Sequence, residues 1–366
     1  MKLESTLEKI EDAVLRVQKV SAKNISLPIL ENVLLIAEDN TLKLRSTNLH
    51  IGVEITLPVK IEKPGRVAVR LDIFSQIITN LKNEHKVVLE VTDNILNIIT
   101  EKSQMEIKLF PDADFPTLPY IEDAVELTIP VDTLIEGVRS VMYSASVSEI
   151  KPEISSVYIY TENNELVFVA TDSFRLSEKR IVAKGVSDFP GLIVPIKNIQ
   201  ECIKIFTGIN GDLKVFISKN QISIASENIY FTSRIIDGNY PDYKQIIPVE
   251  FKTEAVVLKD ELMQSLRLVN VFSDNFNQIL LQVKKGSGAL NINSRNTDIG
   301  ENNTSVDAAV TGEDIDIYIN HKYLSDAFGS FSGDSLTFYF SEKNKPCLLR
   351  GVGDNSFVYL IMPMNR

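Results

Sequence analysis

The stretch "VAVRLDIFSQIITNL" at residues 67–81 joins a short strand pattern to a helical one. Apolar residues in its second half recur at i, i+3, i+4 and i+7, which is typical of the buried face of a helix. The strand-to-helix junction at Val69 recurs at Val194 and at Ile319, each 125 residues after the one before. The matching helical positions are Phe74, Ile77, Ile78 and Leu81; Ile199, Cys202, Ile203 and Phe206; and Leu324, Ala327, Phe328 and Phe331. This spacing predicts one structural unit that occurs three times.

Two further markers recur with this unit. A second helical pattern opens each copy, and runs of alternating apolar residues with turn signals, such as "AEDNTLKL", predict strands between the helices. An apolar or aromatic residue followed by proline closes each copy, at Pro116, Pro241 and Pro363, and we interpret these prolines as equivalent. The opening helical positions are Leu7, Ile10, Val14 and Val17; Leu134, Val138 and Val141; and Leu262, Leu266 and Val269.

The predicted architecture is therefore α+β, with three tandem domains in which two helices pack on an antiparallel sheet. We expect the domains at residues 1–121, 122–246 and 247–366. Tandem copies in one orientation place their helices along one side, and a head-to-tail contact that closes would give a ring.

Composition limits the possible functions. The chain is 44% hydrophobic and 24% charged, with 38 basic and 49 acidic residues and a net charge of −11. This charge disfavours nucleic-acid binding over the whole surface but leaves room for a local basic stripe. No apolar run reaches the ~18 residues of a membrane span, and the amino-terminal segment is unlike a signal peptide. Cys202 and Cys347 follow no ligand spacing, so we expect buried thiols in a reducing cytosol.

The sequence offers no positive sign of catalysis. It contains no phosphate-binding glycine loop, and His50, His85 and His321 lie in distant segments, which disfavours a metal site. The segment "ATDSFRLS" at residues 170–177 has three interpretations: a tight turn in which Asp172 caps its own backbone, a binding loop, or a catalytic loop. We expect a non-catalytic protein that needs no cofactor.

Basic residues fall on or beside the expected helices. One such residue alone is normally solvated surface, but six helices facing a shared lumen would present their charges to a phosphate backbone without reading any base. The candidate DNA-facing residues are Lys9, Arg16, Lys19, Lys23, Arg139, Lys197, Lys204, Arg267 and Lys322.

Five motifs spread along the chain resemble one family. They are "SLPILENVLL" (26–35), "FPDADFPTLP" (110–119), "VATDSFRLS" (169–177), "DGNYPDY" (237–243) and "YLIMPM" (359–364). In this order they resemble the bacterial DNA polymerase III beta subunit, the replicative sliding clamp. The resemblance implies a cytoplasmic homodimer, closed head to tail into a six-domain ring that encircles double-stranded DNA. The implied partners are the polymerase III alpha subunit, the clamp loader, and other polymerases and repair proteins that carry a clamp-binding peptide.

The resemblance also implies a peptide-binding groove between the second and third domains. Relatives usually read Thr-Asp-Gly-His-Arg where this chain has Ser173 and Phe174 at the third and fourth positions, and many end in Arg-Leu rather than Asn365-Arg366. We therefore expect an altered peptide preference. The implied groove residues are Ile154, Thr171, Ser173, Phe174, Arg175, Leu176, Pro241, Ile246, Asn320, Tyr323, Leu360, Ile361, Met362, Pro363 and Met364.

For ring closure the resemblance points to Met105 and Ile107 on a first-domain edge strand, and to Val271 and Phe272 at a third-domain helix end. Two other hypotheses remain open: an enzyme that uses the 170–177 loop, and a monomeric repeat scaffold. Loss of a measurable turnover on substitution of Asp172 would favour the first. Sedimentation as a 41.0 kDa particle, rather than twice that mass, would favour the second.

Overall fold

The computed structural model describes residues 1–366 except 21–26, 122–123, 184–185, 187, 190 and 366. The chain divides into two compact units, and each is considered by itself. The first contains residues 1–134 and 197–237, and the second contains residues 135–196 and 238–366. Each unit thus holds one terminal copy of the repeat and part of the central copy.

The first unit is built on a 13-stranded sheet with the order β10-β15-β16-β17-β4-β3-β2-β6-β9-β8-β7-β1-β5. Its strands are β1 (Lys2–Thr6), β2 (Asn32–Glu38), β3 (Thr41–Thr47), β4 (Ile51–Pro58), β5 (Lys60–Lys63), β6 (Gly65–Arg70), β7 (Lys86–Thr92), β8 (Ile95–Ile99), β9 (Gln104–Phe110), β10 (Val125–Pro130), β15 (Asp212–Ile217), β16 (Gln221–Ala225) and β17 (Ile229–Arg234). Its helices are α1 (Leu7–Val17), η1 (Pro28–Glu31), α2 (Leu71–Asn80) and α4 (Ile196–Phe206).

The second unit is built on a 12-stranded sheet with the order β14-β11-β12-β13-β25-β24-β23-β18-β21-β20-β19-β22. Its strands are β11 (Ser156–Glu162), β12 (Glu165–Thr171), β13 (Arg175–Val182), β14 (Leu192–Pro195), β18 (Thr253–Leu258), β19 (Gln278–Val283), β20 (Ala289–Asn296), β21 (Gly300–Gly312), β22 (Ile315–Asn320), β23 (Ser335–Phe340), β24 (Cys347–Gly351) and β25 (Phe357–Ile361). Its helices are α3 (Val131–Val141), η2 (Met142–Ser144), η3 (Tyr243–Ile246), α5 (Lys259–Val271), α6 (His321–Ala327) and η4 (Phe328–Ser330).

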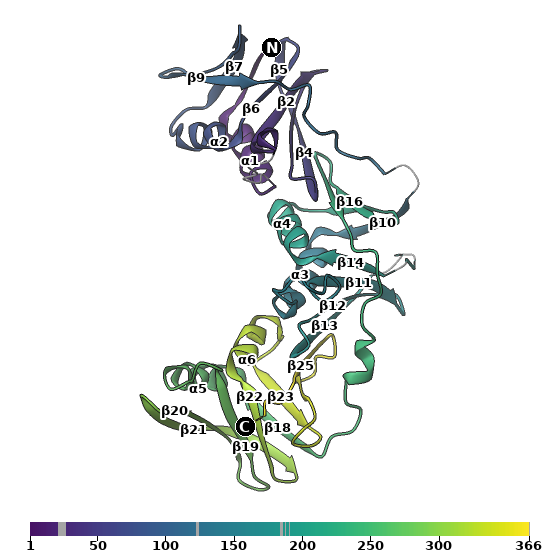
Figure 1. Ribbon diagram of the computed structural model, residues 1–366, viewed down its shortest axis with the longest axis vertical. Coiled ribbons are helices and arrows are strands. Elements are labelled where there is room, and N and C mark those ends of the chain that lie inside the picture. The colour runs from purple at the N-terminus through teal and green to yellow at the C-terminus, as the bar shows by residue number, and fades with distance from the viewer. Residues whose placement is uncertain (21–26, 122–123, 184–185, 187, 190, 366) are drawn as a thin grey trace. The chain divides into compact units, whose positions relative to one another are not determined.

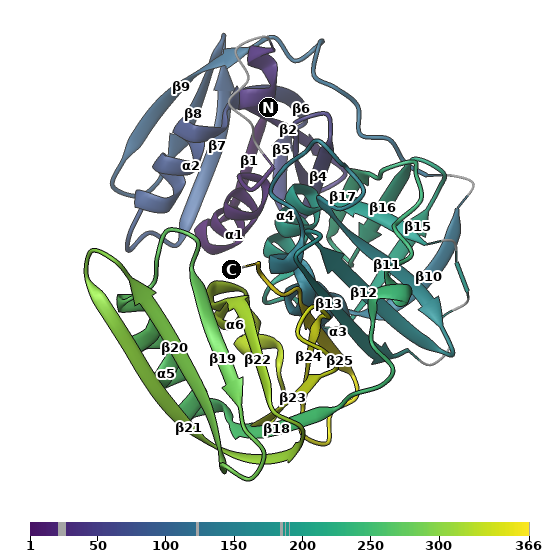
Figure 2. The same ribbon diagram turned by 60° about the horizontal axis from the view of Figure 1, so that its bottom comes forward.

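The repeat predicted from the sequence is confirmed in the helices. Helices α2, α4 and α6 each follow a short strand directly and begin at Leu71, Ile196 and His321, 125 residues apart. The opening helices α1, α3 and α5 bury the apolar stripes expected of them. Helices α1 and α2 pack side by side (Figure 1), and α5 lies along one face of the hairpin β20–β21 (Figure 2). The α+β fold of three tandem domains follows from this repetition.

Both junctions between consecutive copies are made by strand pairing. In the first unit β17 of the central copy pairs antiparallel with β4 of the first, and Ser233 lies opposite Ile51. In the second unit β25 of the third copy pairs antiparallel with β13 of the central copy, and Ile361 lies opposite Arg175. Each sheet therefore runs without a break through one junction.

The strand ends correct one expectation from the sequence. Pro116 and Pro241 lie in the segments that follow β9 and β17, several residues beyond the last paired residue, whereas Pro363 follows β25 almost at once. Since Ser233 and Ile361 hold equivalent places in the pairing, Pro363 corresponds to Ile235 and not to Pro241. The interpretation of Pro363 as a third copy of the same proline is therefore wrong.

Candidate functional site

The loop between β12 and β13 is a tight turn held by its own side chains. The carboxylate of Asp172 accepts hydrogen bonds from the backbone N–H groups of Phe174 and Arg175, both at 2.9 Å. The hydroxyl of Thr171 donates to the carbonyl oxygen of Arg175 at 2.6 Å and accepts from the N–H of Ser173 at 3.2 Å. Asp172 thus caps its own backbone, and the tight-turn interpretation of this segment is confirmed.

Ser173 occupies the left-handed region of backbone conformation, with φ at +76°. A side chain with a Cβ is strained there, and glycine is not. The next residue, Phe174, leaves 60% of its surface exposed. The turn therefore exposes a large aromatic ring, and its backbone is strained at Ser173 but fixed by hydrogen bonds.

Arg175 is held inside the second unit. Its guanidinium lies 3.0 Å from the carboxylate of Asp172 and 2.6 Å from that of Asp326, and 4.6 Å from the ring centre of Tyr323. Burial lowers the pKa of Arg175, but the hydrogen bond to Asp326 and the interactions with Tyr359 and Asp172 together outweigh burial, so the pKa is raised. Burial also raises the pKa of the neighbouring Tyr143 to about 12. This cluster fixes the base of the turn and joins it to α6.

The carboxyl-terminal segment crosses the same region. The N–H of Met362 donates to the carbonyl oxygen of Phe174 at 2.8 Å, and the N–H of Met364 donates to that of Tyr318 at 2.8 Å. The amide of Gln278 donates to the carbonyl oxygen of Asn365 at 2.9 Å. The segment after β25 is therefore tied to the 171–175 turn and to β19 and β22, with Met362, Pro363 and Met364 half-buried.

The segment that leads from the central to the third copy forms another wall. Tyr243 in η3 is buried, and its hydroxyl bonds to the hydroxyl of Tyr160 at 2.7 Å and donates to the carboxylate of Glu178. Lys244 pairs with Glu162, which lowers the pKa of that carboxyl. These contacts fix Ile246, whose side chain is 44% exposed.

Ile246 and Met362 line a cavity of about 680 Å³. Val249, Phe251 and Pro346, which are not among the groove residues expected from the sequence, also line it. Val249 is 91% exposed, which is unusual for an apolar side chain and marks a candidate docking surface. Phe251 could have been found from the sequence, because "PVEFK" places an aromatic residue among the apolar residues of an expected connecting segment.

The other candidate groove residues divide into three groups. One group gathers around the turn: Thr171, Ser173, Phe174, Arg175, Tyr323 and residues 362–364. Leu176, Leu360 and Ile361 are at most 1% exposed, so they belong to the core beneath the groove and do not line it.

Three candidates lie toward the periphery of these contacts. Pro241 is exposed, and its carbonyl oxygen accepts from the N–H of Tyr243 at 2.7 Å. Ile154 is half-buried in the loop before β11. Asn320 caps α6 by accepting from the N–H of Lys322 at 2.9 Å.

Most candidate DNA-facing residues are exposed on the repeat helices or, for Lys19, just after one. In the first unit these are Lys9, Lys19, Lys197 and Lys204, and in the second they are Arg139, Arg267 and Lys322. Arg16 differs, because its side chain is 14% exposed and binds Asp12 and the carbonyl oxygens of Ile205 and Thr207. Arg16 therefore ties α1 to the end of α4. Lys23 lies outside the described residues.

Arg267 and Lys322 line a shallow pocket of about 340 Å³ between α5 and α6. His321 lies beneath them, 2% exposed, and its Nε2 atom has no hydrogen-bond partner among the described residues. Burial lowers the pKa of His321, and the charge of Lys322 lowers it further. The imidazole is therefore neutral near neutral pH, and the positive charge of this face comes from Arg267 and Lys322.

The residues selected for ring closure are only partly at the surface. Met105 is half-buried and Ile107 is 5% exposed, so the side chain of Ile107 packs in the core of its own chain, and its part in ring closure stays a prediction. Its inward position follows from the alternation of β9, in which residues 104, 106 and 108 face outward. Val271 is 59% exposed and Phe272 is half-buried. Leu268, Phe276 and Ile299, which the sequence analysis did not select, are also exposed near this helix end.

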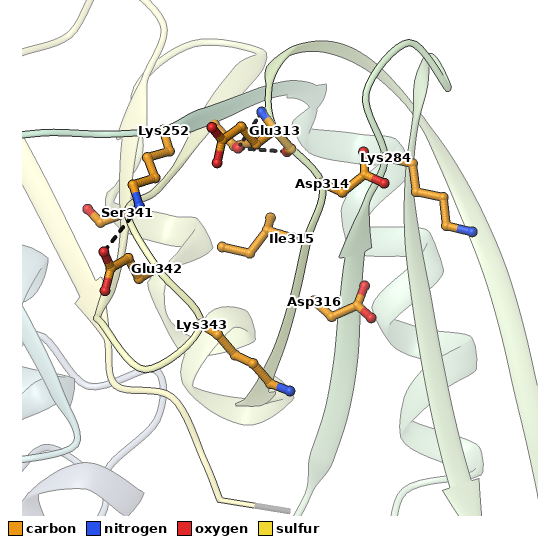
Figure 3. Close-up of a pocket in the computed structure, with 10 residues that line it drawn as sticks. Lys252, Lys284, Glu313, Asp314, Ile315, Asp316, Ser341, Glu342 and Lys343 are labelled. Atoms are coloured by element: carbon orange, nitrogen blue, oxygen red, sulfur yellow. Dashed lines mark hydrogen bonds and ion pairs between the residues drawn. The ribbon is translucent and has the colours of Figure 1, made fainter.

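A charged pocket of about 420 Å³ lies on the third copy (Figure 3). Lys252, Lys284 and Lys343 surround it together with four acidic residues, Glu313, Asp314, Asp316 and Glu342. Lys252 pairs with Glu342 at 3.1 Å, and Asp314 and Asp316 accept hydrogen bonds from Lys285 N–H and Gln282. Its charges therefore compensate one another, and within the described residues no group of His, Cys, Asp and Glu could hold a metal ion.

The two cysteines match the expectation from their spacing. Cys202 and Cys347 are free and fully buried, and burial raises the pKa of both thiols. They are inert members of the two cores. None of the helices in the described ranges is long and apolar enough to cross a membrane.

Comparison with known proteins covers the whole chain. The amino-terminal, central and carboxyl-terminal domains of the DNA polymerase III beta subunit match residues 1–119, 128–242 and 244–365. The beta sliding clamp of Bacillus subtilis is 28% identical over all of this chain and 99% of its own. That of Synechococcus elongatus is 26% identical over 92% of each. The crystal structure of the Bacillus subtilis clamp superposes with a TM-score of 0.95 at 27% identity, covering 100% of this chain and 99% of the other. A beta-subunit structure from Eubacterium rectale gives 0.92 at 27%, covering 100% of both.

Three tandem α+β domains joined by strand pairing define the class of protein as a sliding clamp. The chain belongs to the DNA polymerase III beta subunit family. It is a DNA sliding clamp of the replicative polymerase, a processivity factor with no catalytic activity of its own.

Proposed function

We propose that two copies of this clamp close head to tail into a six-domain ring around duplex DNA in the cytoplasm. We also propose that the 171–175 turn, η3 and the terminal segment form a groove for short linear peptides. The peptides would come from the polymerase III alpha subunit, the clamp loader, and other polymerases and repair proteins. A polymerase tethered in this way rebinds before it diffuses away, which raises its effective concentration at the primer end.

Two unfilled strand edges carry the proposal for the ring. Residues 104–108 of β9 pair only with β8, and residues 300–307 of β21 pair only with β20, among the described strands. The equivalent strands at the two junctions within the chain are paired, β17 with β4 and β25 with β13. A third junction of the same kind therefore needs β9 of one chain and β21 of another, and exposed strand edges favour such pairing.

Exposed apolar side chains beside β21 support the same contact. Leu268 and Val271 lie one helical turn apart on α5, so they share a face, and both are more than half exposed. Burial of such side chains in a dimer would stabilise it by roughly 25 cal/mol per Å². We expect Leu268→Glu with Val271→Glu to convert a particle of twice 41.0 kDa into a single chain. Val352→Glu, another exposed apolar position of the second unit, is the matched control.

Retention on DNA tests the ring directly. The clamp should remain on circular DNA and be lost from the same DNA after linearisation, because a ring slides off free ends. Weak contacts from Lys9, Lys19, Lys197, Lys204, Arg139, Arg267 and Lys322 to phosphates would allow that sliding. Equal retention on both forms would contradict the proposal and would favour ordinary binding.

The alternatives raised by the sequence are weaker. Both oxygens of the Asp172 carboxylate are engaged, one by the turn and the other by Arg175, which disfavours a catalytic role. A monomeric scaffold would leave the outer edges of β9 and β21 unpaired, and sedimentation at micromolar concentration separates it from the ring.

A further inference from the structure

We propose that the junction between the first and central copies carries a second docking groove. Its occupant is an extended peptide of a partner protein with apolar and acidic side chains. The inference rests partly on the function proposed for the 171–175 groove, because it starts from the likeness of the two junctions. It is carried separately by a cavity and a charge distribution within the first unit.

The loop between β3 and β4 repeats the 171–175 turn in its hydrogen bonds. Thr47 donates its hydroxyl to the carbonyl oxygen of Ile51 at 2.8 Å and accepts from the N–H of Leu49 at 3.1 Å. The side-chain oxygen of Asn48 accepts from the N–H groups of His50 and Ile51 at 3.0 and 2.9 Å. Leu49 has φ at +72°, close to that of Ser173. Asn48 lies 124 residues before Asp172, so the two turns are copies of one device.

The strand that crosses this turn is also repeated. The N–H of Arg234 donates to the carbonyl oxygen of His50 at 2.9 Å, as that of Met362 does to Phe174. The pairing registers make Arg234 equivalent to Met362, and Gln221 equivalent to Pro346. Met362 and Pro346 line the cavity of the second unit, and Arg234 and Gln221 line a cavity of the first unit.

A cavity of about 450 Å³ lies at this first-unit junction. Residues 47 and 49–52 of the turn, the connecting segment 116–119, Gln221 and residues 232–234 line it. Leu118 forms part of its wall and fills the space above Gly52, where an added Cβ would meet Leu118 at 2.3 Å. In the second unit the corresponding residues are Leu176 and Tyr243, which belong to one core cluster, so both positions carry larger side chains there.

The charge of this cavity selects its ligand. His50 and Arg234 are exposed on its rim, and none of its lining residues is acidic, although the chain carries 49 acidic residues. The cavity beside Met362 is different, since Glu250 and Glu342 there accompany Lys252 and Lys345. Leu49, 43% exposed, supplies an apolar contact next to the cationic rim. A peptide with a carboxylate beside an apolar side chain matches both features, through a charge-assisted hydrogen bond to Arg234.

The test uses the full chain with labelled methyl groups and two capped probe peptides, GLEFDG and its basic counterpart GLKFKG. Methyl NMR signals of Leu49, Ile51 and Leu118 report the first-unit cavity, and those of Ile246 and Met362 report the groove of the second unit. We expect the acidic peptide to shift the first set and the basic peptide to leave it unchanged. Arg234→Glu should weaken this binding about tenfold or more, as expected for loss of a charge-assisted contact. Lys60→Glu, an exposed basic position on β5, should not.

The outcomes separate the two proposals. No shift of Leu49, Ile51 and Leu118 with the acidic peptide, or equal shifts with both peptides, would overturn the second groove. Shifts there without any at Ile246 and Met362 would support it while leaving the groove of the second unit without support from this probe. If Arg234→Glu fails to fold, the contrast between the two peptides on the unchanged protein still decides.

Discussion

The turns at residues 47–51 and 171–175 have the same backbone and different side chains. Both place an Asx side chain under two consecutive N–H groups, and both hold their third residue at positive φ. In the first turn the capping residue is the neutral Asn48, and Ile51 occupies the position that Arg175 has in the second. In the second the cap is Asp172, whose remaining oxygen accepts a hydrogen bond from Arg175 at 3.0 Å.

This difference distinguishes the backbone hydrogen bonds that every junction requires from the side chains that set the chemistry of each junction's surface. The backbone hydrogen bonds let a strand of the next copy end against the turn, and they recur. The side chains around them vary: Arg234 gives a cationic rim, whereas Phe174 and Met362 give an apolar one. One supporting device can therefore present surfaces of different chemistry.

Removal of the capping side chain should cause the largest difference in stability between the two turns. Asp172→Ala removes two backbone hydrogen bonds and one partner of Arg175, whose side chain is only 11% exposed. We expect a loss of about 2–4 kcal/mol in the free energy of unfolding. Asn48→Ala, which strands no charge, should cost about 1 kcal/mol. Chemical denaturation of both variants measures the difference, and equal losses would contradict the role given to the charge.

Removal of the terminal segment should separate peptide binding from ring formation. Ending the chain after Ile361 keeps β25 but removes the contacts of Met362 and Met364. We expect peptide binding at the second-unit groove to fall about tenfold or more, in line with the loss of a central interface anchor. The dimer mass should remain unchanged in sedimentation. Loss of the dimer before the loss of peptide binding would show that the segment has another role.

Relief of backbone strain should give a smaller gain. Ser173→Gly removes the Cβ at φ +76° and should stabilise the protein by about 1 kcal/mol. Leu49→Gly relieves the same strain but also removes a partly buried apolar side chain, so its net effect should be smaller. Thermal unfolding compares the two. Ser173→Ala is the control, since it retains the Cβ and should give no gain.

Acid should loosen one junction slightly more than the other. The hydrogen bond from Lys244 lowers the pKa of Glu162 below its ordinary value of 4.5. The stabilisation is therefore complete above about pH 4.5 and is lost as pH falls through the lowered pKa of the folded state. Because the pair is partly exposed, we expect less than about 1 kcal/mol. The protection factors of the η3 amides, corrected for the intrinsic exchange rate at each pH, should fall in acid, and Glu162→Gln should remove that dependence. The equivalent segment 116–119 contains no charged residue and serves as the internal reference.

The repeat of helices could be read from the sequence because its signal is periodic. The stripes begun by Leu7 and Leu262 and the junction at Val69 keep their spacing, and burial of an apolar stripe is what makes each helix stable. The turns could not be matched in this way. "STNLHI" and "ATDSFR" share little beyond Thr and an Asx residue, since their common property is backbone conformation.

The differences between expectation and structure lie in or beside strands. Pro363 was matched to Pro241 by an apolar–proline pattern, although strand register makes it equivalent to Ile235. Ile107 lies on a strand with a free edge, but the side chains of an edge strand still alternate between core and solvent, so Ile107 packs inward. Leu176, Leu360 and Ile361 are adjacent in sequence to groove residues, but they are buried because β25 is covered on both faces, with Leu176 and Leu360 in one core cluster and Ile361 in another.

The sheets that run through both junctions have a consequence for cutting the chain. The connecting segments before Pro119 and around Pro241 resemble flexible interdomain linkers in sequence. The strand pairs β4–β17 and β13–β25 nevertheless join the domains at each junction without them. A protease nick in either segment would therefore leave the fragments bound through their strands. Domains connected only by a linker would separate when the linker is cleaved. Domains that share a sheet should stay associated and folded after the chain is cleaved between them.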